Sequence, residues 1–143
     1  MLEMLKTRKE SLEQRGVKGF TLMEMLIVIA IIAVLIAIAI PIFTSQLERA
    51  NEAKDAANLR AAYAIAAANA VTENTNASAG PVTLTQAGKF EYVTDKIGTA
   101  DLTDVDGWTT AYVNVDKATG QATISQTAAS GYTVYDPVSG EEA

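Results

Sequence analysis

The sequence predicts an α+β protein in which a long N-terminal α-helix packs against a small C-terminal antiparallel β-sheet. Three observations support this fold class. An uninterrupted apolar run opens the chain's first helical segment, an Ala-rich run of helix formers follows it, and short segments rich in Thr, Val, Ile and aromatic residues lie near the C-terminus. We therefore divide the chain into a basic leader at 1–19, a membrane-spanning helix at 20–43, an amphipathic helical half at 44–72 and a small β-sheet head at 73–143.

The composition excludes the commonest catalytic and metal-binding chemistry. The 143 residues include no cysteine and no histidine, and the formal net charge is −6. Thiol nucleophiles, disulfides, cysteine metal sites and imidazole bases are therefore absent, and no glycine-rich phosphate loop or serine elbow occurs. The sequence predicts a protein that is not an enzyme and has no cofactor or metal, with an enzyme that uses carboxylates alone as the alternative, for which no paired signature occurs.

The leader is basic, with five Lys or Arg against three Glu, and the first basic residue after the apolar run is Arg49. Positive charge stays in the cytoplasm, so we expect a cytoplasmic N-terminus and an outward C-terminal part. Removing residues 1–19 leaves six basic and fourteen acidic residues, a net charge of −8. Direct nucleic-acid binding by the remaining chain is not expected.

Residues 20–43 are long enough to cross a bilayer. A helix of that length reaches roughly 36 Å, against about 30 Å of hydrocarbon. Fifteen of these residues are Leu, Ile, Val or Phe, and their favourable insertion outweighs the cost of the one acidic residue, Glu24. An ordinary secretory signal cut before Ile40 and a permanent anchor are the two alternatives.

The stretch KGFTLME, residues 18–24, leads directly into the apolar run and resembles the junction of a type IV prepilin with its class III signal sequence. The resemblance implies that a membrane-embedded prepilin peptidase cuts after Gly19 on the cytoplasmic side and methylates the new N-terminus, Phe20. It also implies that Glu24 is the assembly residue, pairing with the N-terminal amine of a neighbouring subunit. Cleavage would create that amine four residues before Glu24, on the same helix face.

Pro41 is the second irregularity of the apolar run. It lacks an N–H and its ring clashes with the carbonyl of Ala37, so we expect a kink or local loosening there.

The segment after Phe43 is predicted to stay helical to about Thr72. It carries a narrow stripe of small apolar residues, which Lys54 interrupts: Leu47, Ala50, Ala57, Ala61, Ala64, Ala68 and Val71. A sheet could cover one face of this helix and neighbouring subunits another, while a coiled-coil stalk is the alternative.

In the head, residues 73–81 are predicted to form a loop, and residues 82–97 a connection with one short helix or strand. Three strands follow at 108–115, 122–126 and 132–135, with a turn at 116–120 between the first two. We expect a three-stranded antiparallel meander that needs the helix as its second layer.

Two local patterns are weak signals. Asp101, Asp104 and Asp106 could suggest calcium, but they match no complete EF-hand, and a solvated acidic turn is the better interpretation. Asn76-Ala77-Ser78 matches a glycosylation sequon in a loop where chance explains it.

Together these features predict a structural protein: a type IV pilin precursor, held in the membrane until cleavage and then polymerised with identical subunits into a pilus at the cell surface. Its expected partners are identical pilin subunits, the prepilin peptidase, the pilus assembly machinery and, before assembly, the membrane. A pseudopilin of a type II secretion or competence DNA-uptake system is the nearest alternative. A membrane-anchored binding domain that never polymerises is a more distant one.

Overall fold

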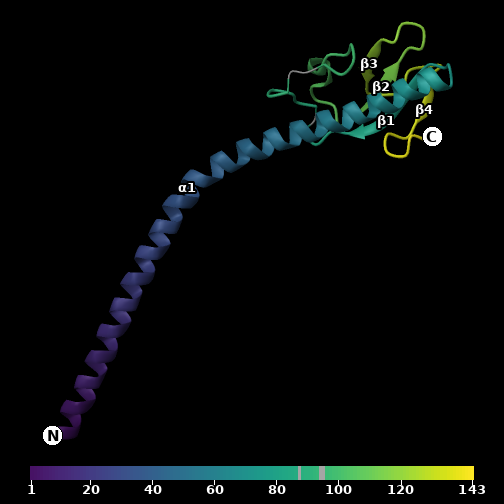
Figure 1. Ribbon diagram of the computed structural model, residues 1–143. Coiled ribbons are helices and arrows are strands. Elements are labelled where there is room, and N and C mark those ends of the chain that lie inside the picture. Colours follow the sequence, from purple (N-terminus) through teal and green to yellow (C-terminus); the bar gives the residue numbers. More distant parts are fainter. Residues whose placement is uncertain (87, 94–95) are drawn as a thin grey trace. The chain divides into compact units, whose positions relative to one another are not determined.

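The computed structural model describes residues 1–86, 88–93 and 96–143, with side chains undescribed at 11–20 and 104. The elements run in the order α1 (Leu2–Thr72), β1 (Ala77–Thr83), the 3-10 helix η1 (Leu102–Val105), β2 (Thr110–Val115), β3 (Ala122–Ser125) and β4 (Thr133–Tyr135) (Figure 1). The chain forms two compact units, Met1–Ser45 and Gln46–Ala143. The predicted α+β class is confirmed, whereas the finer division at residues 19, 43 and 72 stays a prediction.

Helix α1 ends at Thr72. The last residue, Thr72, donates its hydroxyl to the carbonyl of Ala68 at 2.9 Å, and the Glu73 N–H still bonds to the Asn69 carbonyl at 2.9 Å. Asn74 then adopts a left-handed conformation with φ +49°. Asparagine tolerates this conformation, which is common just beyond a helix C-terminus.

The sheet has four strands in the order β3-β2-β1-β4. The pairs β1/β2 and β2/β3 are antiparallel, but β1 and β4 are parallel, with Ala77 opposite Thr133. The predicted antiparallel meander was therefore wrong in two respects, because the chain crosses from β3 to the far edge and because the sheet has one more strand.

That additional strand, β1, begins inside the segment predicted to be a loop. Its Ala, Ser, Gly and Pro residues read as turn formers, yet the strand lies between β2 and β4. A Cβ on Gly80 would lie 2.5 Å from Cδ1 of Tyr112, so the close approach of β1 to β2 requires glycine there. A register shift between Ala79 and Val82 accommodates the irregular stretch.

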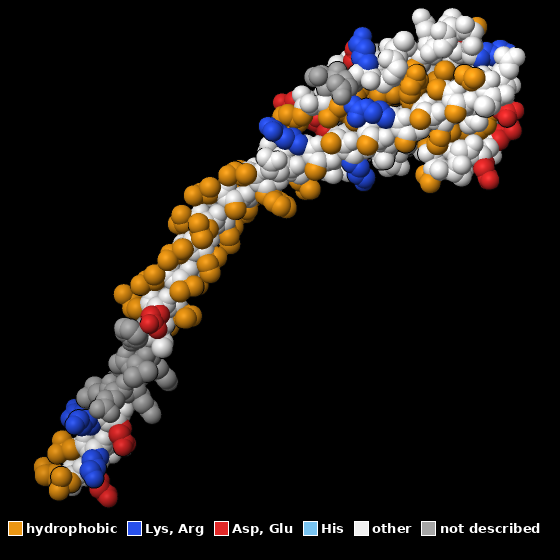
Figure 2. All heavy atoms as spheres, viewed as in Figure 1, with side chains coloured by type: hydrophobic (Ala, Val, Ile, Leu, Met, Phe, Trp, Pro, Cys, Tyr) orange, Lys and Arg blue, Asp and Glu red, His pale blue; other side chains and the backbone are white. Residues whose placement is uncertain are grey.

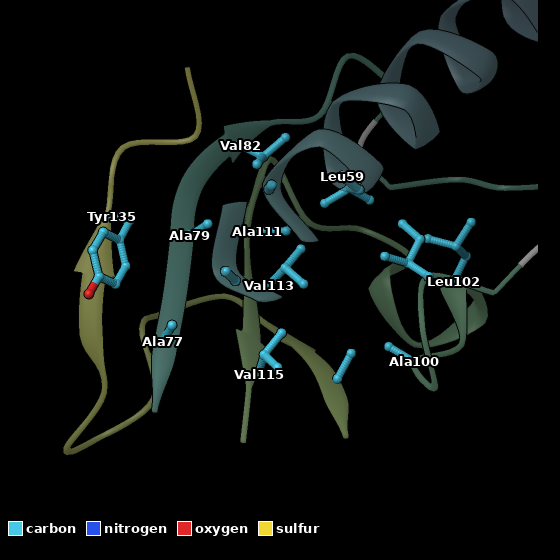
Figure 3. Close-up of a cluster of buried hydrophobic side chains, with 14 of the residues drawn as sticks. Leu59, Ala77, Ala79, Val82, Ala100, Leu102, Ala111, Val113, Val115 and Tyr135 are labelled. Atoms are coloured by element: carbon cyan, nitrogen blue, oxygen red, sulfur yellow. The ribbon is translucent and has the colours of Figure 1, made fainter. Parts of the chain in front are cut away.

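One core joins α1 to the sheet within residues 46–143. Alternate residues of β1 and β2 face the helix, and Figure 3 shows Leu59 of α1 pointing towards Val113. The helix contributes mostly alanines, which allow its backbone to lie close to the sheet. The buried hydrophobic residues of α1 are Ala56, Leu59, Ala62, Ala66 and Ala70.

Two turns share the pattern Asp-x-x-Ser/Thr-Gly. In the predicted one, Asp116 Oδ1 accepts backbone N–H bonds from Ala118 and Thr119 at 2.9 and 2.8 Å. These bonds, led by that from the Thr119 N–H, lower the pKa of Asp116. The sequence analysis missed the second turn, 136–140, where the Ser139 N–H, at 2.7 Å from Oδ1, is the largest cause of the lowered pKa of Asp136.

Candidate assembly site

Helix α1 presents a continuous apolar surface over residues 21–43, here called the apolar belt. Every large hydrophobic side chain in it is exposed, from 45% at Val28 to 69% at Phe43. Figure 2 shows the belt as a band of hydrophobic side chains around the helix. Exposed apolar surface of this extent marks a membrane or protein interaction site. Among the described residues, α1 from Thr21 onward is the one helix long and apolar enough to span a membrane.

Glu24 lies near the N-terminal end of the apolar belt and is the single ionisable residue in it. Arg49 is the first basic residue after it in the chain. A carboxylate carried into an apolar environment is costly unless a cation pairs with it, so Glu24 needs a partner from outside the belt.

The predicted cleavage and methylation positions, Gly19 and Phe20, lie outside the side chains that the structure describes. Helix α1 includes both residues within its bounds. By helical rise the backbone nitrogen of Phe20 precedes that of Glu24 by about 6 Å along the axis, roughly one turn.

Pro41 lies inside α1, which continues past it. The missing N–H leaves the Ala37 carbonyl without its usual helical donor. Nearby, the Thr44 hydroxyl lies 3.0 Å from the carbonyl oxygens of both Ile40 and Pro41 and donates to this pair. A kink at Pro41 stays a prediction.

The stripe of small residues predicted for the second half of the helix faces outward. All seven of its apolar residues and Lys54 are exposed, with Leu47 at 50% and Val71 at 82%. The head covers the adjacent face, which begins at Glu52 and includes Leu59. The second helical half of α1 is therefore apolar on two faces, of which its own head covers one.

Sequence reasoning missed two buried carboxylates on the covered face. Glu52 is 3% exposed and accepts the Tyr92 N–H at 2.8 Å, while Asp55 is 1% exposed and accepts the Thr85 N–H at 2.7 Å. The signal was available, because Glu52, Asp55 and Leu59 recur at three-four spacing with the buried alanines. Together these carboxylates fasten the segment after β1 to the helix.

A ring contact strengthens the same attachment. The Arg49 guanidinium carbon lies 4.4 Å from the centroid of the Tyr92 ring, within cation–π range. The segment around Tyr92 is thus held by a carboxylate at its backbone and a cation at its side chain.

The acidic turn serves as a helix cap. Asp101 is the N-cap of η1, and its Oδ1 accepts the Thr103 N–H at 3.1 Å. That bond is the largest cause of the lowered pKa of Asp101, followed by the Thr103 hydroxyl. The Asp104 side chain lies outside the described residues. Within the described part of the chain no cluster of three or more potential metal-ligating side chains occurs.

The sequon is occupied by structural contacts. Ser78 is fully buried and donates to Asn114 Oδ1 at 2.7 Å, while Asn76 Oδ1 accepts the Lys117 N–H at 3.0 Å. The Ser78 side chain of the sequon is therefore inaccessible in the folded head.

Comparison with known proteins locates the chain's similarities. Residues 14–40 match a family described as "Prokaryotic N-terminal methylation motif". The chain is 52% identical over 56 residues to the Type IV narrow pilus major component PilA5 of Thermus thermophilus, an overlap of 37% of this chain and 48% of that protein. It is 58% identical over 38 residues to the Type IV wide pilus major component PilA4 of the same organism, covering 27% and 29%.

A third relative matches over a longer stretch. The Competence protein ComGC of Streptococcus pneumoniae is 34% identical over 96 residues, which cover 63% of this chain and 89% of that protein. The chain thus spans about half or less of the two pilus components, but most of the competence protein. No solved structure matches the chain significantly.

Proposed function

The chain belongs to the type IV pilin-like precursors, and from this premise we propose that it is a filament subunit, cleaved after Gly19, methylated on Phe20 and polymerised with identical copies. One observation carries the proposal: Glu24 is the lone carboxylate of an exposed apolar helix, inside the matched methylation motif. No catalytic role is proposed.

Cleavage is the step that gives Glu24 a partner. It removes the basic leader and creates an α-ammonium group on Phe20 at the edge of the apolar belt. In lipid or between packed helices this cation and the carboxylate of Glu24 are each costly alone and stabilising as a pair. Pairing between copies fixes the stagger of one subunit against the next.

The apolar belt then changes its surroundings. Before assembly its exposed side chains face lipid, and in the filament they face the belts of identical subunits. The outward stripe on the second half of α1 extends this packing surface, since its small residues allow neighbouring helices to approach closely. Lys54 is the charged residue within it.

The charge of the leader and the apolar belt also indicate where each part of the chain lies in the cell. The basic leader stays on the cytoplasmic side, the belt crosses the inner membrane, and the head lies outside. The prepilin peptidase acts at the cytoplasmic surface, and the assembly machinery moves the belt from the membrane into a pilus at the cell surface.

A pseudopilin of a competence DNA-uptake system is the second candidate, favoured by the long match to the competence protein. A pseudopilin of type II secretion shares the same leader and helix. Electron microscopy of cells with the head labelled by antibody distinguishes them, because a pilin gives long surface filaments and a pseudopilin gives short structures confined to the envelope.

Glu24→Ala tests the proposal in cells, with Glu48→Ala as the matched control because Glu48 is an exposed acid on the same helix. Removing one partner of a buried ion pair costs about 3–5 kcal/mol, a hundredfold or more in the equilibrium for adding a subunit. We expect normal membrane levels and normal cleavage of Glu24→Ala, with sheared surface filaments lost. Filament yield equal to that of Glu48→Ala would remove the role assigned to Glu24.

A further inference from the structure

The first turns of α1 expose an apolar ridge, formed by Met1, Met4 and Leu5. Their side chains are 105%, 80% and 63% exposed, and a shallow hollow lies between them and Arg8. Figure 2 shows hydrophobic side chains gathered at this end of the helix, beside basic ones. Nothing in the proposed function accounts for apolar residues in a segment that cleavage removes.

The ridge belongs to an amphipathic pattern. At about 100° per residue, Met1, Met4 and Leu5 share one face of the helix, and Glu3 and Glu10 lie on the opposite face. Lys9 flanks the ridge, Arg8 lies on the ridge face between Met4 and Leu5, and Lys6 lies towards the acidic face. An apolar face with basic residues on it and beside it, and with the acidic residues turned away, is typical of a helix that lies in a membrane interface.

We propose that residues 1–10 dock on the bilayer surface through this ridge and that the ligand is the anionic headgroup layer of the membrane that holds the apolar belt. Two observations select this occupant. The lysines are complementary to anionic lipid phosphates, and ten residues of chain connect the docked segment to Thr21, the start of the candidate span. The ridge is therefore always held close to a membrane surface, where Met and Leu enter the headgroup boundary and the lysine stems reach to the phosphates.

Docking requires α1, which is one helix from Leu2 to Thr72 in the structure, to bend between the leader and the belt when the chain meets a bilayer. The two glycines in the sequence of α1, Gly16 and Gly19, fall in that interval. Glycine has the greatest backbone freedom, so this is where a helix turns at least cost. The inference rests on the belt spanning a bilayer and is independent of polymerisation.

The test uses the full-length, uncleaved chain, whose lack of cysteine permits single labels. Leu5→Cys places an environment-sensitive fluorophore on the ridge, and Thr7→Cys places it about 200° away on the same helix. Each chain is reconstituted singly in nanodiscs of phosphatidylcholine alone or with phosphatidylglycerol. We expect blue-shifted emission from position 5 in the anionic discs, and water-like emission from position 5 in the neutral discs and from position 7 in both.

A charge variant completes the design. Lys9→Gln, in the Leu5→Cys chain, should lower the ratio of docked to free leader about fivefold, since a lysine near an anionic surface is worth about 1 kcal/mol. Equal emission from positions 5 and 7 in anionic discs would overturn the proposal. A blue shift at position 5 of equal size in neutral and anionic discs would also overturn it. A blue shift that occurs only when a disc holds two chains would do the same. A chain that does not insert would overturn the span and this docking together, whereas loss of pili with docking intact would count against the proposed function alone.

Discussion

Asp55 is the buried carboxylate through which α1 holds the segment that follows β1. Its side chain is 1% exposed, and Oδ2 accepts the backbone N–H groups of Thr85 at 2.7 Å and Gln86 at 3.1 Å. Replacing Asp55 with Ala deprives both donors of their acceptor and leaves space beside the core. We expect the head to lose a large part of its stability.

The magnitude follows from the two bonds. A hydrogen bond to a charged acceptor contributes about 1.5–3 kcal/mol. Because Thr85 is an exposed residue, water can replace the acceptor of its N–H, whereas Gln86 is half-buried. Asp55→Ala should therefore cost about 2–4 kcal/mol, and Asp55→Asn about half as much because one neutral acceptor oxygen remains.

Urea unfolding of the full chain in detergent micelles measures this cost. Trp108, the chain's one tryptophan, is partly buried against the core, so its emission reports unfolding of the head. With a urea slope of about 1–3 kcal/mol/M, Asp55→Ala should lower the midpoint by roughly 1 M or more. Asn58→Ala, an exposed change one turn away, should stay within about 0.5 kcal/mol of the native chain. If the midpoints of Asp55→Ala and Asn58→Ala coincide, the two bonds do not hold this segment.

Two further predictions concern the head. Gly88→Ala should destabilise it far more than Gly120→Ala in the same urea assay. Both glycines have positive φ, but a Cβ on Gly88 would lie 1.9 Å from the Val105 carbonyl oxygen, whereas a Cβ on Gly120 would have nothing within 4 Å. Equal urea midpoints for the two variants would contradict the close approach at Gly88. Folding lowers the pKa of Asp116 and Asp136 below the ordinary 3.8, chiefly through the backbone N–H three residues later. Their contribution to the free energy of unfolding should be complete above pH 3.8 and lost as the pH falls through the lowered values, and a double Asn variant that loses stability just as steeply on acidification would refute it.

The sequence predicted those parts of the fold that depend on local patterns. Residues 20–72 of helix α1 follow from the apolar run and the Ala-rich segment after it, whereas its extension through the leader to Leu2 was not predicted. Strands β2, β3 and β4 follow from their Val, Thr, Ile and Tyr content. Strand β1 was missed because its small residues carry no strand pattern of their own. It forms since neighbouring strands pair with both of its edges and Gly80 admits the Tyr112 ring.

The sequence also did not predict which face of α1 the head covers. From Ala61 onward nearly every residue of α1 is apolar, so periodicity could not decide which face the sheet covers. Glu52 and Asp55 were missed because charged residues are expected outside. Their burial depends on N–H groups thirty or more residues away, which no local pattern reveals.

The residues of the candidate assembly site, unlike Glu52 and Asp55, could be identified from the sequence. Glu24 and Pro41 are conspicuous because each is a lone exception in an apolar run, and such an exception can be found by inspection. In the proposed filament the partner of Glu24 belongs to another copy of the chain, so its identity stays a prediction.

The most direct measurement of the central claim is the N-terminus of the protein isolated from its cells, read by mass spectrometry. The account predicts a chain that begins at Phe20 and carries one methyl group on its α-nitrogen, recovered from filaments. A chain that begins at Met1, as a permanent anchor would, or at Ile40, as an ordinary signal would leave it, contradicts the account.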